Sequence, residues 1–196
     1  GFNVTIPYKI EVMKYLNEID ESARIIGAVN TVVIKDRRLK GYNTDGKGFL
    51  RCLEENANTK AEGKNILILG AGGASRAIAM TLAMNKANSI YICNRTYERA
   101  VALSNDINKV SPVLSKAIPM EYKSMKKAID NSDILINTTK VGMYPDIGNS
   151  PIDKSLLHKD LIVYDIVYNP EKTVLLQDAE YMGCKTISGL WMLVYQ

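Results

Sequence analysis

Apolar runs alternate with amphipathic stretches over most of this chain. From residue 65 onward the apolar runs are short and continuous, and most are followed by apolar residues at helical spacing. This alternation is typical of a parallel sheet that helices cover on both faces. The predicted strands are Ile66–Leu69, Ile90–Cys93, Ile134–Asn137, Leu161–Ile166 and Lys185–Ile187, and the predicted helices are Ala74–Met84, Tyr97–Ile107, Met120–Ile129, Thr173–Tyr181 and Gly189–Gln196.

The first part of the chain has shorter apolar stretches and more turns. Alternating apolar positions predict strands there, and Pro7 suits the first turn of a helix. Two strands around the polar turn Lys35–Arg38 predict a hairpin, whose antiparallel pairing implies a mixed sheet. The predicted elements are strand Phe2–Ile6, helices Tyr8–Leu16 and Glu21–Ile25, strands Asn30–Ile34 and Leu39–Asn43, helix Gly48–Glu55 and a polar linker over Asn56–Lys64.

These patterns predict an α/β fold in unequal parts. Residues 1–55 are expected to form part of a domain with a mixed sheet, and residues 56–188 a second domain around a parallel sheet. Residues 189–196 are expected to begin a helix that returns to the first domain. Hinges are expected near Asn56–Lys64 and Ser188–Gly189, where the chain crosses between the two parts.

Composition excludes several classes of function. The 196 residues carry 25 Lys and Arg against 21 Asp and Glu, spread along the chain, so a nucleic-acid partner is not indicated. The chain has neither an apolar run of about 18 residues nor a signal-peptide pattern, and membrane insertion and export are not expected. The widely spaced Cys52, Cys93 and Cys184 support neither disulfides nor a metal site and favour the cytoplasm. The single histidine, His158, is expected on the surface.

The glycine-rich turn after the strand Ile66–Leu69 is the clearest motif. Backbone N–H groups and the dipole of the following helix can hold a pyrophosphate there, as in Rossmann-like dinucleotide-binding domains. Ser75 takes the third position of the G-x-G-x-x-G pattern, which packing tolerates because serine is small. An ordinary strand-to-helix connection is the alternative. The candidate cofactor-binding residues are Gly70, Ala71, Gly72, Gly73 and Ala74.

The end of the next strand discriminates between the two nicotinamide cofactors. NAD-binding domains place Asp or Glu there to bind the ribose hydroxyls, whereas this chain has Asn94, Arg95 and Thr96, followed by Arg99. Guanidinium groups and a hydroxyl would bind a 2′-phosphate, so the predicted cofactor is NADP. Thr96 could also cap the following helix. Alternatively, the two arginines form a solvated helix face with Glu98.

Two residues of the first part are candidates for proton exchange. Lys9 is expected in the first turn of a helix, where the positive end of the dipole disfavours a cation. Asp45 follows a predicted strand end and could orient the lysine as a carboxylate partner. A surface lysine and a turn-forming aspartate are the ordinary alternatives.

Seven ordered segments resemble the shikimate dehydrogenase family. They extend from the first residue to the last, which makes the series more specific than any single glycine pattern. The resemblance implies reversible NADPH-dependent reduction of 3-dehydroshikimate to shikimate, in the pathway to the aromatic amino acids, without a metal. The segments are Gly1–Lys9, Gly27–Thr31, Asn43–Gly46, Gly70–Ala74, Asn94–Thr96, Asn137–Thr139 with Gly142–Met143, and Gly189–Gln196.

The resemblance also implies roles for single residues. Lys9 matches the family's catalytic lysine, which exchanges the proton of the reacting hydroxyl, and Asp45 matches the aspartate that forms the catalytic pair with it. The implied substrate contacts are Thr5, Asn30, Asp45, Tyr168 and Gln196, and the implied cofactor contacts are Glu21, the five residues of the glycine turn, Asn94, Arg95, Thr96, Arg99, Ile166 and Gly189.

By the resemblance, we expect the chain to lack a counterpart of the family's N-terminal portion, which supplies two serines for the substrate carboxylate, and to have a shorter last helix. We therefore expect the 196-residue chain to keep cofactor binding better than turnover. The alternatives are a quinate/shikimate dehydrogenase that uses NAD and a non-catalytic NADP-binding module. Glutamyl-tRNA reductase is disfavoured because Cys52 lies in a predicted helix without an activating group. The expected assembly is a monomer or a homodimer.

Overall fold

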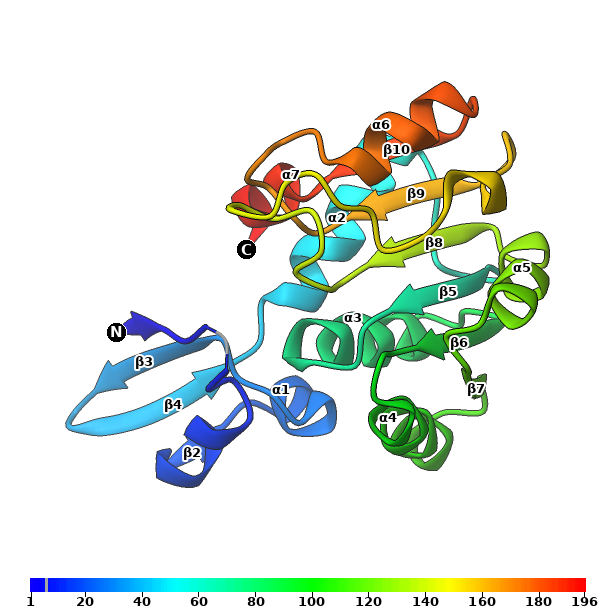
Figure 1. Cartoon of the computed structure of the whole chain (residues 1–196). Helices are drawn as coiled ribbons and strands as arrows, with labels where there is room; N and C mark the ends of the chain where they lie inside the picture. The colour runs from blue at the N-terminus through cyan, green and yellow to red at the C-terminus, as the bar shows by residue number, and fades with distance from the viewer. Residues whose placement is uncertain (6) are drawn as a thin grey trace.

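A computed structural model describes residues 1–5 and 7–196 and contains two separate sheets (Figure 1). The larger sheet is parallel throughout, with the strand order β10-β9-β8-β5-β6-β7. Consecutive strands are connected across its faces, which places their carboxyl ends along one edge. Its strands are β5 (Asn65–Leu69), β6 (Ser89–Cys93), β7 (Leu114–Ile118), β8 (Ile134–Asn137), β9 (Ile162–Asp165) and β10 (Lys185–Ser188).

Helices cover both faces of this sheet, which explains its continuous apolar strands. Alternate residues of β5 point to opposite faces, so Ile66 and Ile68 enter one core while Leu67 and Leu69 enter the other. The first core is closed by α2 (Asp45–Ala57), α3 (Gly73–Met84) and α4 (Tyr97–Val110), and the second by α5 (Tyr122–Asp130), the 3-10 helix Lys154–Leu156 and α6 (Val174–Tyr181). The last helix, α7 (Gly189–Tyr195), packs against α2.

The smaller sheet has the order β1-β3-β4-β2 and is mixed. The hairpin strands β3 and β4 pair antiparallel, β1 pairs antiparallel with β3, and β2 pairs parallel with β4. The two sheets together confirm the expected α/β class with one parallel and one mixed sheet. The bounds are β1 (Phe2–Asn3), β2 (Glu18–Ile19), β3 (Thr31–Lys35) and β4 (Arg38–Tyr42), with helix α1 (Glu21–Ile26) between β2 and β3.

Arg76 of α3 joins the two parts of the molecule. Its Nε atom donates to the carbonyl of Ile26 at the end of α1 over 2.6 Å, and its Nη1 atom pairs with Asp106 of α4 at 2.8 Å. Gly27 follows Ile26 with a positive φ and leaves room for the guanidinium, because a Cβ there would meet it. The arginine therefore fixes the end of α1 against the glycine-turn helix.

The expected helix Tyr8–Leu16 is wrong. Residues 7–10 form a turn, and only Glu11–Tyr15 is helical, as a 3-10 helix. The Lys9 carbonyl accepts a hydrogen bond from the Val29 N–H over 2.8 Å instead of from the next turn of a helix. A contact distant in sequence thus overrides the local helical pattern. The expected strand Phe2–Ile6 is also shortened to Phe2–Asn3, and its Ile6 lies outside the described residues.

Two strands were not predicted. β7 is an edge strand in which burial alternates and Ser115 is a buried position, so it lacks the continuous apolar run of its neighbours. β2 has only two residues. The other differences concern boundaries: α2 begins at Asp45 rather than Gly48 and continues into the expected linker as far as Ala57, and α5 begins at Tyr122 rather than Met120.

Phe49 of α2 stacks on Tyr164 of β9, with ring centroids 4.7 Å apart and both side chains fully buried. We expect Phe49→Ala to lower the free energy of unfolding by about 3–5 kcal/mol, because it opens a cavity between α2 and the sheet. Urea denaturation of both proteins measures the difference. Phe2→Ala is the matched control, since Phe2 is 47% exposed; equal losses for the two variants would contradict the assignment of Phe49 to the core.

Candidate active site

The glycine turn joins β5 to α3 at the carboxyl edge of the large sheet. Gly70 has a φ of +111°, and a Cβ at this residue would collide with the Thr138 hydroxyl, so glycine is required there. The Ser75 hydroxyl is fully buried and donates to the Gly70 carbonyl over 2.7 Å. Serine at the third glycine position therefore stabilises the turn through this hydrogen bond, and its small side chain also fits beside the strand. A Cβ at Gly72 would meet nothing within 4 Å, which leaves free space above the helix N-terminus.

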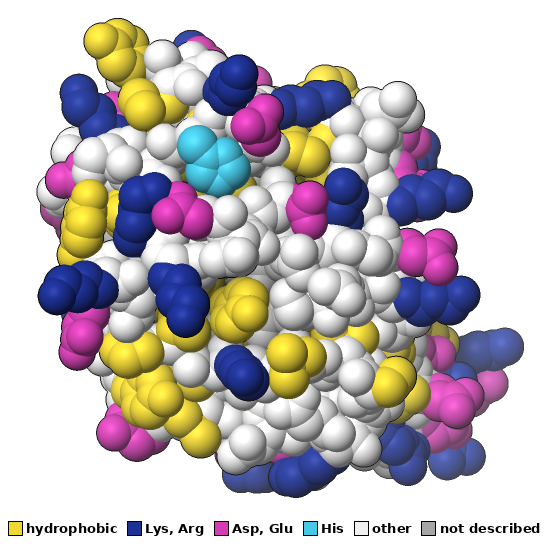
Figure 2. Space-filling view, turned by 90° about the vertical axis from the view of Figure 1, so that its right-hand side faces the viewer, with side chains coloured by type: hydrophobic (Ala, Val, Ile, Leu, Met, Phe, Trp, Pro, Cys, Tyr) yellow, Lys and Arg dark blue, Asp and Glu magenta, His cyan; other side chains and the backbone are white. Residues whose placement is uncertain are grey.

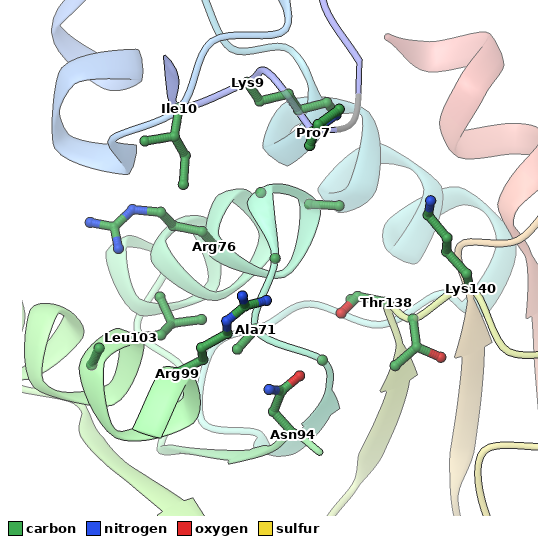
Figure 3. Close-up of a pocket in the computed structure, with 16 residues that line it drawn as sticks. Pro7, Lys9, Ile10, Ala71, Arg76, Asn94, Arg99, Leu103, Thr138 and Lys140 are labelled. Atoms are coloured by element: carbon green, nitrogen blue, oxygen red, sulfur yellow. The ribbon is translucent and has the colours of Figure 1, made fainter. Parts of the chain in front are cut away.

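A cavity of about 550 Å³ lies over this turn. Figure 3 shows Asn94 and Arg99 on one side of it and Lys140 on the other, with the glycine turn between them. Lys9 reaches it from the first part of the chain. The cavity is lined by Pro7, Lys9, Ile10, Gly70, Ala71, Gly72, Gly73, Ala74, Arg76, Asn94, Arg99, Ala102, Leu103, Thr138, Thr139 and Lys140.

Five of the expected cofactor contacts do not line this cavity; Ile166 and Gly189 line the adjoining one, and Arg95, Thr96 and Glu21 line neither. Arg95 and Thr96 are exposed beside the cavity over the glycine turn, and Glu21 is exposed in the first turn of α1. Thr96 occupies the N-cap position of α4, but its side chain makes no capping hydrogen bond, which corrects the expectation that it caps the helix. Instead, the Asn94 side-chain amide donates to the Thr96 carbonyl over 2.8 Å.

A second cavity, of about 470 Å³, adjoins the first at Lys9, Ala74 and the loop after β8. It gathers residues from both ends of the chain, since Thr5, Asp45, Tyr168 and Gln196 all line it. Ile166 and Gly189, the expected nicotinamide contacts, line it too. Gly189 approaches the Ile166 carbonyl so closely that a Cβ would collide with that group. Four of the five expected substrate contacts therefore share one cavity.

Lys9 and Asp45 form an ion pair where the two cavities meet. The Lys9 Nζ atom lies 2.6 Å from Asp45 Oδ2, and their side chains are 13% and 2% exposed. Asp45 is the first residue of α2, so the positive end of the helix dipole favours its negative charge. Lys9 itself lies in a turn, which corrects the expectation of a helical first turn: Asp45 and the Val29 N–H hold it, not a helix of its own.

Asn30, the fifth expected substrate contact, lies behind this pair rather than in the cavity lining. It is 6% exposed, and its amide nitrogen donates to Asp45 Oδ1 over 2.8 Å and to the Thr44 hydroxyl over 2.9 Å. Its carbonyl oxygen accepts from the Thr44 N–H over 2.9 Å. The Asp45 carboxylate is thus fixed by a backbone and side-chain network before any ligand binds.

The loop after β8 was missed as part of the site. Thr138, Thr139 and Lys140 line both cavities, and the Thr138 hydroxyl donates to the Leu69 carbonyl over 2.6 Å. The sheet order reverses between β5 and its neighbours β6 and β8, and ligands bind at such a switch point in open α/β sheets. The motif Asn137–Thr139 was the available signal, but its position relative to the glycine turn follows only from the strand order.

Among the side chains that the structure describes, no group of three or more His, Cys, Asp or Glu could hold a metal ion. All three cysteines are buried, and burial raises the pKa of the Cys93 thiol to about 11. His158 is half-buried rather than on the surface, because a ring N–H can donate to the Ile129 carbonyl, 3.2 Å from Nε2.

The outer surface carries charges of both signs. Figure 2 shows the face at the amino ends of the large sheet's strands, where Lys and Arg are interspersed with Asp and Glu. Over the described part of the chain, the structure has no helix with the length and apolarity needed to cross a membrane.

Two family models match this chain. The model described as shikimate / quinate 5-dehydrogenase matches residues 53–168, and the model described as shikimate dehydrogenase substrate binding domain matches residues 1–32. Shikimate dehydrogenase (NADP(+)) of Methanocaldococcus jannaschii is 50% identical over 198 residues, covering 100% of this chain and 68% of the relative. The chain therefore spans about two thirds of that relative.

Solved structures agree with the sequence relatives. A crystal structure of shikimate dehydrogenase in complex with NADP+ aligns with a TM-score of 0.91 and 46% identity, covering 99% of this chain and 67% of the other. Shikimate 5-dehydrogenase from Listeria monocytogenes, in complex with shikimate and NAD, aligns with a TM-score of 0.90 and 39% identity, covering 98% and 68%. On the family model over most of the parallel-sheet region and on identities near one half, the chain belongs to the shikimate dehydrogenase family.

Proposed function

We propose that this chain catalyses the reversible reduction of 3-dehydroshikimate to shikimate with NADPH as the reductant. The observation that carries the proposal is the Lys9–Asp45 pair at the junction of two cavities, one over a dinucleotide-type glycine turn and one lined by polar residues from both ends of the chain. NADPH supplies a hydride to the carbonyl carbon when both ligands are bound. The protein's task is then to position the ligands and to handle one proton.

The residues over the glycine turn fit a dinucleotide phosphate. Gly72 leaves open space for a pyrophosphate against the N-terminus of α3, and Arg99 and Asn94 flank that space. Gly70 to Ala74 would hold the pyrophosphate through their backbone, and Arg99, with Arg95 and Thr96 beside it, would hold the 2′-phosphate. Ile166 and Gly189 would border the nicotinamide in the adjoining cavity.

Lys9 has the position needed for the proton. In the reduction its ammonium group donates a proton to the carbonyl oxygen, and in the reverse direction its neutral amine takes the proton from the hydroxyl. Asp45 holds the Nζ atom in place and accepts hydrogen bonds from substrate hydroxyls, while Asn30 holds Asp45. Thr5, Tyr168 and Gln196 would surround the substrate ring. The test is NADPH oxidation on addition of 3-dehydroshikimate by the protein at its full encoded length.

The second candidate function is a quinate/shikimate dehydrogenase that uses NAD. One observation favours it: the Listeria monocytogenes structure holds shikimate with NAD, and a family model that matches this chain is described for both substrates. Arg99 in the cofactor-side cavity, with no Asp or Glu among its lining residues, supports NADP instead.

We expect Arg99→Ala to weaken NADP+ binding about 10- to 100-fold, which corresponds to the loss of one hydrogen bond to a charged group. NAD+ binding is expected to change about twofold or less, because NAD+ has no 2′-phosphate. Arg95→Ala should show a smaller effect of the same kind, since Arg95 lies beside the cavity. Fluorescence titration of the 196-residue chain with each cofactor measures both affinities.

Lys109→Ala is the matched control for the arginine variants. Lys109 lies on the same helix and is exposed, but it does not line the cavity. Equal weakening of NADP+ and NAD+ by Arg99→Ala would contradict a 2′-phosphate site and favour the NAD-dependent alternative.

A further inference from the structure

The mechanism leaves one buried carboxylate unused. Asp165 is the last residue of β9 and is 0% exposed. In the sheet register it lies between Asn137, the last residue of β8, and Ser188, the last residue of β10. The loops that leave β8 and β9 at these positions both line the cavity proposed for the substrate.

Three donors from different elements converge on this carboxylate. Its Oδ1 atom accepts from the Asn137 side-chain amide and from the Val167 N–H, each over 3.0 Å. Its Oδ2 atom accepts from the Thr173 hydroxyl over 2.7 Å. Thr173 is the N-cap of α6, where its hydroxyl also accepts from the Leu176 N–H over 3.4 Å. A single side chain thus connects β8, the loop after β9 and the start of α6.

Asn137 links the Asp165 carboxylate to the loop after β8. Its carbonyl oxygen accepts from the Thr139 N–H over 3.0 Å and from the Thr139 hydroxyl over 2.8 Å. The Thr139 hydroxyl accepts in turn from the Val141 N–H over 3.1 Å. Because the Asp165 carboxylate orients the amide of Asn137, it also determines which end of that amide faces Thr139. Thr139 lines both cavities.

Among the residues that the structure describes, the groups that face Asp165 are uncharged. They are Asn137 from β8, Ser188 from β10, Thr173 from α6 and the backbone of its own loop. Burial raises the pKa of the Asp165 carboxyl to about 6 even though the three hydrogen bonds oppose the shift. A negative charge without a cationic partner is costly at a buried position. Side chains of this kind next to a cleft are candidates for a functional role.

We propose that Asp165 is a positioning residue for the reaction: its carboxylate fixes the loops that carry Thr139 and Tyr168 in the geometry that binds the substrate. This inference rests on the proposed function for the identity of the substrate. The ionised carboxylate accepts from all three donors, whereas a protonated carboxyl must donate one hydrogen bond itself. The Thr173 hydroxyl, which is 1% exposed, then loses its acceptor.

The experiment follows kcat/KM for shikimate, at saturating NADP+, from pH 5 to pH 8 in the full-length protein. In the wild type, kcat/KM is expected to fall as the pH drops through about 6, the value to which burial raises the Asp165 pKa. Asp165→Asn resembles the protonated acid, so its kcat/KM is expected to be about tenfold lower at pH 8 and to show no fall near pH 6. Its Kd for NADP+ should remain within about twofold of the wild-type value, because the three hydrogen bonds of the Asp165 carboxylate involve neither the glycine turn nor Arg99.

Two variants of Thr173 test the hydrogen bond from its side chain to Asp165, and Thr173 lines neither cavity. Thr173→Val removes one hydrogen bond to the charged form, which moves the fall in kcat/KM to higher pH. Thr173→Ser keeps the hydroxyl and is expected to retain the wild-type profile. Ser104→Ala is the control for stability, because it breaks another buried hydrogen bond, the 2.8 Å contact with Ser115, between residues that line neither cavity.

Amide hydrogen exchange gives a readout that does not depend on the substrate. Exchange at Thr139 and Val167 is expected to be faster in Asp165→Asn than in the wild type, with Asn65 of β5 unchanged as a reference. Wild-type exchange at these amides in the Asn variant, or an unchanged fall in its kcat/KM near pH 6, would overturn the inference. If Ser104→Ala lowers kcat/KM equally, the role is purely structural and the inference fails. Faster exchange in a protein that does not oxidise shikimate would overturn only the proposed substrate.

Discussion

Replacing Lys9 by alanine is expected to lower kcat for shikimate oxidation by about 10²- to 10⁴-fold, the usual contribution of a positioned acid or base. The Nζ atom is the proposed proton-exchanging group and lies at the junction of the cavities, 2.6 Å from Asp45 Oδ2. The Kd for NADP+ should change about twofold or less, because the glycine turn and Arg99 remain. Steady-state kinetics of the full-length protein and fluorescence titration measure the two quantities.

Two further lysine variants distinguish the loss of proton exchange from the loss of the positive charge and from misfolding. Lys9→Arg keeps a cation that can pair with Asp45, but arginine stays protonated at neutral pH, so turnover should again be lost. Lys14→Ala removes an exposed lysine that pairs with Glu11, 3.0 Å away, and should leave kcat unchanged. Loss of both NADP+ binding and turnover in Lys9→Ala would indicate misfolding, and unchanged turnover would favour a non-catalytic NADP-binding module.

Gly72→Val is expected to weaken NADP+ binding by about two orders of magnitude, which corresponds to the loss of one or two hydrogen bonds to phosphate at roughly 1.5–3 kcal/mol each. The backbone at Gly72 has φ −92° and ψ −169°, which valine adopts readily. A Cβ there meets no atom within 4 Å, so the side chain enters the cavity without disturbing the fold. It occupies the space through which a pyrophosphate would reach the turn.

Gly148→Val provides the matched control for this substitution. Gly148 is exposed, a Cβ there also meets nothing within 4 Å, and the residue lines neither cavity. Both variants should unfold at wild-type urea concentrations, while only Gly72→Val loses affinity for NADP+. Normal NADP+ affinity in Gly72→Val would contradict the placement of the pyrophosphate over the turn.

Local pattern was sufficient for the strands of the parallel sheet other than β7, because each of the central strands is a continuous apolar run between turn residues. It was insufficient where contacts distant in sequence decide the structure. The Val29 N–H interrupts the helix expected around Lys9, and the alternating burial of β7 hides that edge strand from a search for apolar runs. Short-range rules describe neither case.

The candidate site also contains some residues that local sequence predicts and others that depend on contacts distant in sequence. Residues whose chemistry is local, such as the glycine turn and Asn94, were found from the order of residue types. Lys9 and Asp45, 36 positions apart, were expected as partners, but their contact depends on β3 and β4, which bring Asn30 beside the start of α2. The position of the loop after β8 and the role proposed for Asp165 depend on strand order and register, which no single stretch of sequence specifies.

The burial of all three thiols has a practical consequence. Cys52, Cys93 and Cys184 are buried, and burial raises the pKa of each thiol, so maleimide reagents at neutral pH find little thiolate to attack. Cysteines introduced on the exposed hairpin and on α5 would take up fluorophores without removal of the native residues. The protein is therefore suited to single-molecule measurement of the separation between its two sheets as ligands bind.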